Sequence, residues 1–148
     1  MPKLLLLAAC EQVIIDLNNT VSLLKLIQEV TAQVPAGMTP PLNAASPMQW
    51  RVVAIFEQEA GDQDKRFEQY TALVSSSGDS LFQTPISLFE MKAEQHRITT
   101  EVNGIPVGRV GKHQVKCFLR EKGTVQWKEC GSYPLRIKWA PSLIITPN

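Results

Sequence analysis

The sequence has little of what marks a specialised class of protein. Three cysteines in 148 residues make an odd and small number, which does not suit a framework of disulfides. No apolar run approaches the roughly 18 residues that a membrane-spanning helix needs. Neither sign of charge dominates, since the sequence contains 15 basic and 14 acidic residues. This near-neutrality argues against a strongly basic nucleic-acid binder and against an acidic tail.

What remains is the composition of an ordinary globular protein, with 44% hydrophobic and 20% charged residues. A chain of this length can bury a core without help from disulfides or metals. We therefore predict a single domain over residues 1–148, ending in a short tail at 141–148.

The first ten residues allow two interpretations. Leu7-Ala8-Ala9-Cys10 matches the cleavage pattern of a bacterial lipoprotein, in which Cys10 would carry lipid. However, the apolar run Leu4 to Ala9 is shorter than the roughly 7–15 residues of a signal sequence. The apolar pattern also continues beyond Cys10 in Val13-Ile14-Ile15. We favour a buried first strand and a cytoplasmic protein with free thiols.

Most of the chain has the pattern of short strands between turns. Leu4–Asp16 and Val21–Val34 flank Leu17-Asn18-Asn19-Thr20, whose asparagines tolerate the positive φ of a tight turn. The second run also has apolar residues near helical spacing, but it is short of charges for a surface helix, so we favour a strand. Trp50–Gln58 is apolar on both faces, which is typical of a central strand.

Two segments predict irregular structure. Pro35 to Gln49 holds four prolines, which suit neither a helix nor a central strand, and a loop of this length tends to be functional or mobile. Asn103 to Gly111 holds three glycines and a proline, and it predicts a turn or bulge before the strand His113–Glu121. That strand alternates, with Val115, Cys117 and Leu119 on one side. In the last part of the chain Leu135, Ile137 and Trp139 alternate with basic residues, as in a half-buried strand.

Short strands, frequent turns and no strong helix predict an all-β fold. We expect a two-sheet antiparallel β-sandwich, immunoglobulin-like, with about seven to nine strands. The three tryptophans fit alternating strands, and we expect them in the core.

A resemblance points the same way. Cys10-Glu11-Gln12-Val13-Ile14-Ile15-Asp16, a hairpin, Trp50 at the start of a strand and Asn103-Gly104-Ile105-Pro106-Val107-Gly108 before a long strand together resemble an uncharacterised bacterial family of small single-domain β-sandwich proteins. The resemblance covers about Leu4 to Trp139 and rests on turns and core residues. It implies an immunoglobulin-like sandwich from a bacterium or phage, and it brings no catalytic residues.

Residues that could carry chemistry are few. Glu57, Glu59, Asp62 and Asp64 offer oxygen ligands for Ca²⁺, but we favour a solvated turn because basic residues follow directly. No nucleophile elbow and no glycine-rich phosphate loop precedes a helix. We therefore predict no enzymatic activity.

Soft-metal ligands are equally sparse. His96, His113, Cys117 and Cys130 lack the spacing of a zinc site. Cys117 and Cys130 fall on strands that we expect to pair, so the sequence predicts two buried thiols close to one another. We predict no metal and no cofactor.

Charge is distributed unevenly along the chain. Residues 1–90 hold five basic and ten acidic residues, net −5, whereas residues 91–148 hold ten basic and four acidic residues, net +6. A functional interpretation is a basic sheet face that binds an anion or nucleic acid. Its residues would be Lys116, Arg120, Arg136 and Lys138. We favour a solvated face whose cations pair with acidic neighbours, because such sites also need exposed aromatics and few are expected here.

The leading hypothesis is a non-enzymatic interaction module. β-Sandwiches bind through loops at one end or through an exposed sheet edge. We place the partner site in the Pro35–Gln49 loop and in the segment Gly104–Lys112, at Pro40, Pro41, Leu42, Met48, Ile105, Pro106 and Arg109. We expect another protein or a second copy of the chain as the partner, and neither a nucleic acid nor a membrane span.

Overall fold

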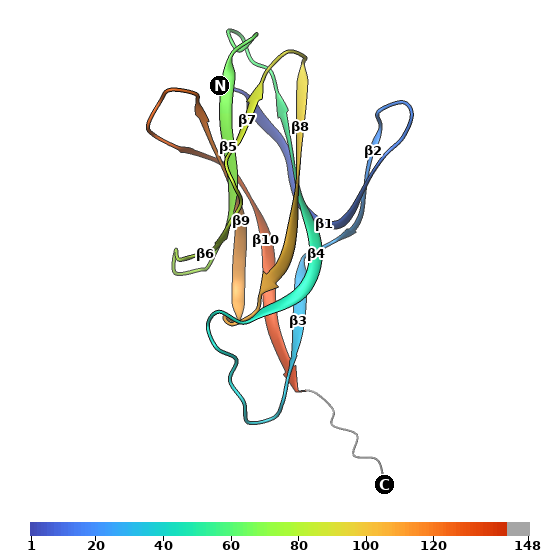
Figure 1. Ribbon diagram of the computed structural model, residues 1–148, viewed down its shortest axis with the longest axis vertical. Helices are drawn as coiled ribbons and strands as arrows, with labels where there is room; N and C mark the ends of the chain where they lie inside the picture. Colours follow the sequence, from blue (N-terminus) through green and yellow to red (C-terminus); the bar gives the residue numbers. More distant parts are fainter. Residues whose placement is uncertain (142–148) are drawn as a thin grey trace.

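The computed structural model describes residues 1–141, which contain ten strands and no helix (Figure 1). The strands are β1 (Lys3–Ile15), β2 (Val21–Leu26), β3 (Glu29–Val34), β4 (Ala45–Glu57), β5 (Arg66–Val74), β6 (Ser80–Gln83), β7 (Ser87–Glu90), β8 (Gln95–Pro106), β9 (Gly111–Glu121) and β10 (Lys128–Pro141). The smaller sheet has the order β2-β1-β4-β8. The larger has the order β3-β10-β9-β5-β6, and β7 also pairs with β5. The predicted all-β arrangement of two packed sheets is confirmed.

Three details of the prediction are wrong. The described residues form ten strands rather than seven to nine, because Val21–Val34 divides and β6 and β7 are additional short strands beside β5. The sheets are not wholly antiparallel, since β3 runs parallel to β10. Pro141 ends β10 instead of opening a tail, and the rest of the predicted tail lies outside the described residues.

β1 and β2 form the predicted hairpin. Asn19 has a φ of 60°, and the Asp16 carboxylate accepts hydrogen bonds from the backbone N–H of Asn18 (2.8 Å) and of Thr20 (2.9 Å). β1 pairs with β4 as far as Cys10 and beyond this residue pairs with β2 alone. The hairpin therefore projects past the rest of its sheet (Figure 1).

The run Val21–Val34 is strand, as predicted, but it is shared between the two sheets. Lys25 has a φ of 56°, which turns the chain near the end of β2. Ile27 is buried, and its N–H donates to the carbonyl of Ala9 at 2.8 Å. The chain then continues as β3 at the edge of the larger sheet.

β4 is the central strand that its two apolar faces predict, because it lies between β1 and β8. It begins at Ala45 rather than at Trp50, so the predicted loop Pro35–Gln49 is irregular only over residues 35–44. A bulge in the ladder with β8 lies between Ser46 and Gln49. This bulge accommodates Pro47, which has no N–H to donate.

The core between the sheets consists of two clusters. One surrounds Trp50 and Leu73, and the other surrounds Phe56, Phe67 and Met91. As predicted, alternate residues of β9 and β10 face inward: Val115, Cys117, Leu119, Leu135 and Ile137 are all buried. Trp50 is the one tryptophan that is fully buried among the described residues, while Trp127 and Trp139 are half-buried, so the prediction that all three lie in the core is only partly right.

Candidate functional site

The two predicted binding segments meet at one end of the sandwich. The first is the loop of residues 35–44, and the second is the β8–β9 turn, residues 107–110. The N–H of Val107 donates to the carbonyl of Ala44 at 2.9 Å, and the indole N–H of Trp139 donates to the carbonyl of Val107 at 2.6 Å. A Cβ on Gly108 would lie 2.3 Å from the carbonyl oxygen of Pro41, so the backbones are in direct contact there. We call this region the loop end.

The predicted residues of the first segment are mostly accessible. Pro41 and Leu42 are exposed, and 74% of the Leu42 surface is free. Pro40 is half-buried at the wall of a pocket. Met48 lies in β4, where it packs against the core around Trp50, so it contributes to the fold more than to the surface.

The predicted residues of the second segment have three different environments. Ile105 is 0% exposed and belongs to the core, so it is not part of the surface at the loop end. Pro106 is the half-buried last residue of β8, opposite Ala45. Arg109 lies in the turn and forms an ion pair with Asp79 at 2.8 Å.

An apolar pocket of about 250 Å³ opens at the loop end. One wall is the end of the edge strand β3, with Ala32 and Val34, and the other walls are the 35–44 loop and Val107. Met38 lines the pocket and leaves 64% of its surface exposed. The volume is below the range of about 300–1,000 Å³ typical of small-molecule sites. The pocket therefore suits one or two apolar side chains better than a cofactor.

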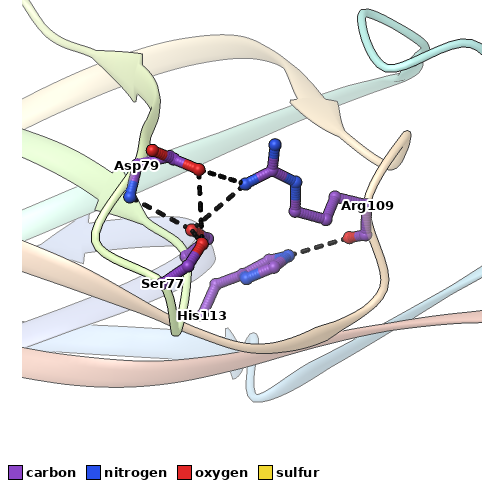
Figure 2. A network of polar contacts seen from close by, with 5 residues as sticks. Ser77, Asp79, Arg109 and His113 are labelled. Atoms are coloured by element: carbon purple, nitrogen blue, oxygen red, sulfur yellow. Dashed lines mark hydrogen bonds and ion pairs between the residues drawn. The ribbon is translucent and has the colours of Figure 1, made fainter.

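A polar network fixes one side of the loop end, and it joins the β8–β9 turn to the β5–β6 turn (Figure 2). The Arg109 guanidinium donates to the Asp79 carboxylate at 2.8 Å and to Ser75 Oγ at 3.3 Å. Ser77 Oγ donates to the same carboxylate at 3.2 Å. The Arg109 hydrogen bond is the main reason that the pKa of Asp79 is below its usual range, and Ser77 adds to the effect.

The side chain of His113 contacts the backbone of the turn that carries Arg109. The side chain is 1% exposed, and its Nε2 lies 2.8 Å from the carbonyl oxygen of Arg109 (Figure 2). Nε2 is the donor in this contact, because a carbonyl oxygen can only accept. Nδ1 has no hydrogen-bond partner among the described residues, so the ring is not paired with the nearby serines. The arrangement therefore positions the turn and does not have the serine–histidine contact of a nucleophilic site.

The predicted basic face lies on the outer surface of the larger sheet, but most of its cations are paired. Lys116 contacts Glu129 at 2.7 Å, and Lys138 contacts Glu29 at 2.6 Å. The Arg120 guanidinium bonds Glu68 at 3.0 Å. The expectation that acidic neighbours neutralise this face is thus met at three of its four residues, two of them by carboxylates from the acidic half of the chain.

Arg136 differs from these three. It lies between Lys112 in the β9–β10 ladder and Glu29 in the β3–β10 ladder, and among residues 1–141 neither cation has a carboxylate within 4 Å, because Glu29 bonds Lys138 instead. Like charges in opposed positions repel each other. Both side chains border an open groove of about 500 Å³. Lys112 was not among the four residues predicted for the basic face, and only the strand register could reveal its position opposite Arg136.

A group of aromatic side chains on the same outer surface was also missed. Tyr70 stacks on Phe118 with ring centroids 4.8 Å apart, and Trp127 meets Tyr70 edge-on at 4.7 Å. The Arg120 guanidinium lies 4.0 Å from the centre of the Trp127 ring. All three rings are half-buried, so the expectation of few exposed aromatics on this face is met. Their faces are largely occupied by each other and by Arg120.

The remaining candidate residues do not converge. No group of three or more His, Cys, Asp or Glu side chains able to hold a metal ion occurs in the described part of the chain. In the acidic turn, Asp62 is buried and accepts a hydrogen bond from the N–H of Glu59 at 2.9 Å, so it holds the turn. Cys10 is buried in the middle of β1. Cleavage before Cys10 would remove the segment Lys3–Ala9, which pairs with β4.

No helix among the described residues is both long and apolar enough to cross a membrane. The sequence matches no protein-family model and no curated protein. The resemblance to the bacterial β-sandwich family therefore stays a prediction.

Proposed function

We propose that this protein is a non-enzymatic interaction module that binds an extended segment of another protein at the loop end. The observation that carries the proposal is the apolar pocket at the end of the edge strand β3, beside the exposed Met38 and Leu42. An edge strand offers unpaired N–H and C=O groups to an incoming strand. The adjoining pocket would then accept one of the alternate side chains of that strand and supply specificity.

The rigidity of the site supports the same function. The Trp139 and Val107 hydrogen bonds hold the pocket wall in place, and Arg109 ties the neighbouring turn to Asp79. A preformed pocket lowers the entropy lost on binding. Methionine in the pocket wall adds a flexible apolar surface that adapts to different side chains.

Photo-crosslinking tests this function. A photoreactive phenylalanine analogue replaces Leu42 at the loop end. In the control protein it replaces Val125, which is 86% exposed in the β9–β10 connection. We expect discrete protein adducts from position 42 in a cell extract, and their loss when Met38→Asp is added. An adduct of two 16.5 kDa chains would identify a second copy as the partner. Equal adducts from both positions, or none from position 42, would contradict the proposal.

A second candidate function is anion binding at Lys112 and Arg136. It is favoured by their opposed, unpaired charges beside an open groove. Fluorescence titration at low ionic strength with inorganic phosphate and with a labelled oligonucleotide would distinguish a small anion from a nucleic acid. We expect binding to be lost in Lys112→Ala and Arg136→Ala but kept in Lys122→Ala, which removes a cation from the β9–β10 connection. Unchanged binding in all three variants would exclude this site.

We also propose that the sandwich is immunoglobulin-like. The proposal is supported by the pairing of β4 with β8 in one sheet and the order β10-β9-β5 in the other. In this comparison β4 and β8 correspond to strands B and E of an immunoglobulin domain. Likewise, β10, β9 and β5 correspond to its strands G, F and C. The extra hairpin strand β2 and the parallel pair β3–β10 are additions to that minimal pattern.

A further inference from the structure

Cys117 and Cys130 are in contact across β9 and β10. The Cys130 thiol donates to the carbonyl oxygen of Cys117 at 3.2 Å. The ladder between the strands is interrupted between Glu129 and Gly131, and Gly131 is the direct partner of Cys117. Cys130 is the extra residue of this bulge. The bulge therefore places its sulfur next to Cys117.

The two thiols differ in accessibility. Cys117 is completely buried in the cluster around Phe56 and Phe67, whereas Cys130 is half-buried at the margin of that cluster. A small polar reagent can therefore reach Cys130 first. The third cysteine, Cys10, is also completely buried and belongs to the other sheet.

We propose that Cys117 and Cys130 form a dithiol that hydroperoxides oxidise reversibly to an intramolecular disulfide, with Cys130 reacting first. In a bulge two residues of one strand oppose a single residue of the other, so Cys130 and Gly131 together face Cys117. The contact of the Cys130 thiol with the Cys117 carbonyl places the two residues close enough for a disulfide to be tested. This inference is independent of the function proposed for the loop end.

The proximity of the two thiols also divides the roles of the two sulfurs. It lowers the pKa of Cys130, whereas proximity to Cys130 and burial raise the pKa of Cys117. The thiolate is the reactive form of cysteine, so a thiol with a lowered pKa is the better nucleophile at neutral pH. Cys117 stays protonated until an electrophilic sulfur is formed beside it.

The chemistry proceeds in two balanced steps. The Cys130 thiolate attacks one oxygen of hydrogen peroxide; an S–O bond forms, the O–O bond breaks, and the departing hydroxide takes a proton to give water. The sulfur of Cys117 then attacks the sulfur of Cys130. The S–S bond forms, the S–O bond breaks, and the departing hydroxide takes the proton of Cys117 as a second water. The two thiols are oxidised and one peroxide is reduced.

The test is oxidation of the full-length folded protein with hydrogen peroxide, followed by denaturation, alkylation and peptide mapping by mass spectrometry. We expect two of the three thiols to be lost, with one cross-linked peptide pair containing Cys117 and Cys130. Dithiothreitol should restore all three. Cys10→Ser is the matched control and should still form the cross-link. A folded protein that keeps three thiols, or that joins Cys10 to either partner, would overturn the proposal.

The order of reaction is tested with two further variants. In Cys117→Ser, Cys130 should stop at sulfenic acid and be labelled by dimedone, whereas in Cys130→Ser neither remaining cysteine should be labelled. The reverse labelling pattern would show that Cys117 reacts first. Far-UV circular dichroism checks that both variants fold. Peptide mapping of the protein without substitutions shows whether the disulfide forms, even if a variant does not fold.

Discussion

At the scale of single residues, Gly108 is the most constrained position at the loop end. Its φ is not in the left-handed region, so the constraint is one of space rather than of backbone conformation. A Cβ there would lie 2.3 Å from the carbonyl oxygen of Pro41 and 2.5 Å from that of Leu42. Both neighbours are backbone atoms, which cannot rotate away as a side chain would.

We therefore expect Gly108→Ala to destabilise the fold by about 1–3 kcal/mol, because the 35–44 loop must shift to admit the methyl group. Urea denaturation measures the loss. Gly37→Ala is the control in the same loop: it has open space around its Cβ but a φ of +79°. The strain at this φ costs about 1 kcal/mol without moving the β8–β9 turn. A larger loss for Gly37→Ala than for Gly108→Ala would refute this account.

His96 gives the fold a dependence on pH. Its ring stacks on Phe89 with centroids 4.7 Å apart, and burial, followed by the charge of Arg97, lowers the pKa of His96 below 6.5. The unfolded chain therefore binds this proton at a higher pH than the folded protein does. By linkage, stability falls as the pH is lowered through about 6.5 and continues to fall until the folded state is protonated too.

The free energy of unfolding is measured at several pH values between about 8 and 5, which is the range in which histidine titrates. The variant His96→Phe keeps an aromatic ring against Phe89 and removes the titration. We expect its stability to decrease less over this interval than that of the unmodified protein. Parallel curves for the two proteins would show that His96 does not contribute.

At the scale of elements, the β8–β9 turn is held by contacts from three other segments. Asp79 binds it from the β5–β6 turn, Ala44 from the 35–44 loop, and Trp139 from β10. Each of these segments is far from the others in sequence. The turn therefore acts as a junction that fixes the geometry of the loop end.

We expect Asp79→Asn to loosen this junction and leave the fold intact, because it removes the charge that Arg109 contacts. Hydrogen exchange of the amides of residues 107–113 should accelerate. The folded-state pKa of Asp79 is depressed, so its stabilising effect is present above the normal aspartate range of about 3.9 and is lost as the pH falls through the folded value. Glu101→Gln, which removes the exposed carboxylate paired with Arg51 in the other sheet, should leave these amides unchanged.

At the scale of the whole molecule, stability comes from the apolar core that the two sheets enclose. Trp50 is 1% exposed and lies in the cluster beneath the loop end, where its indole N–H donates to the carbonyl of Gly104 at 2.8 Å. Trp127 instead lies on the outer surface of the larger sheet, against Tyr70 and Arg120. The two tryptophans thus report separately on the core and on the surface.

We expect Trp50→Ala to cost about 3–5 kcal/mol, because it leaves a large cavity and an unpaired carbonyl. Trp127→Ala should cost about 1 kcal/mol, which is the size of an aromatic pair contact. Both values follow from chemical denaturation monitored by circular dichroism. Equal losses in the two variants would contradict the division between core and surface.

Local patterns predicted most of the strands but, apart from the β1–β2 and β9–β10 pairs, not their partners. Alternation assigned inward faces to Val115, Cys117 and Leu119 correctly, because side chains of any strand alternate with period two. The continuous pattern of Val21–Val34 gave no sign that β2 and β3 belong to different sheets. That division depends on the pairing of β3 with β10, and these two strands are separated by more than 90 positions in the sequence.

The candidate site was predictable to a similar extent. The prolines and glycines marked both loops, but their contact through Gly108 and Pro41 needed the packed sheets. The sequence likewise contained the cations of the basic face and the carboxylates that neutralise them, without showing that Glu68 faces Arg120. Ile105 was misplaced because a residue before proline in a glycine-rich segment looks like loop, whereas tertiary packing buries it.

By itself, the sequence determined where the chain is extended, where it turns and which face of each strand is apolar, because these depend on neighbours within a few residues. The tertiary structure alone decided the junction at the loop end, the carboxylate that each cation contacts and the bulge that brings the Cys130 thiol to the carbonyl of Cys117. These features depend on strand register and on the bulge in β10, which are set by long-range packing between strands.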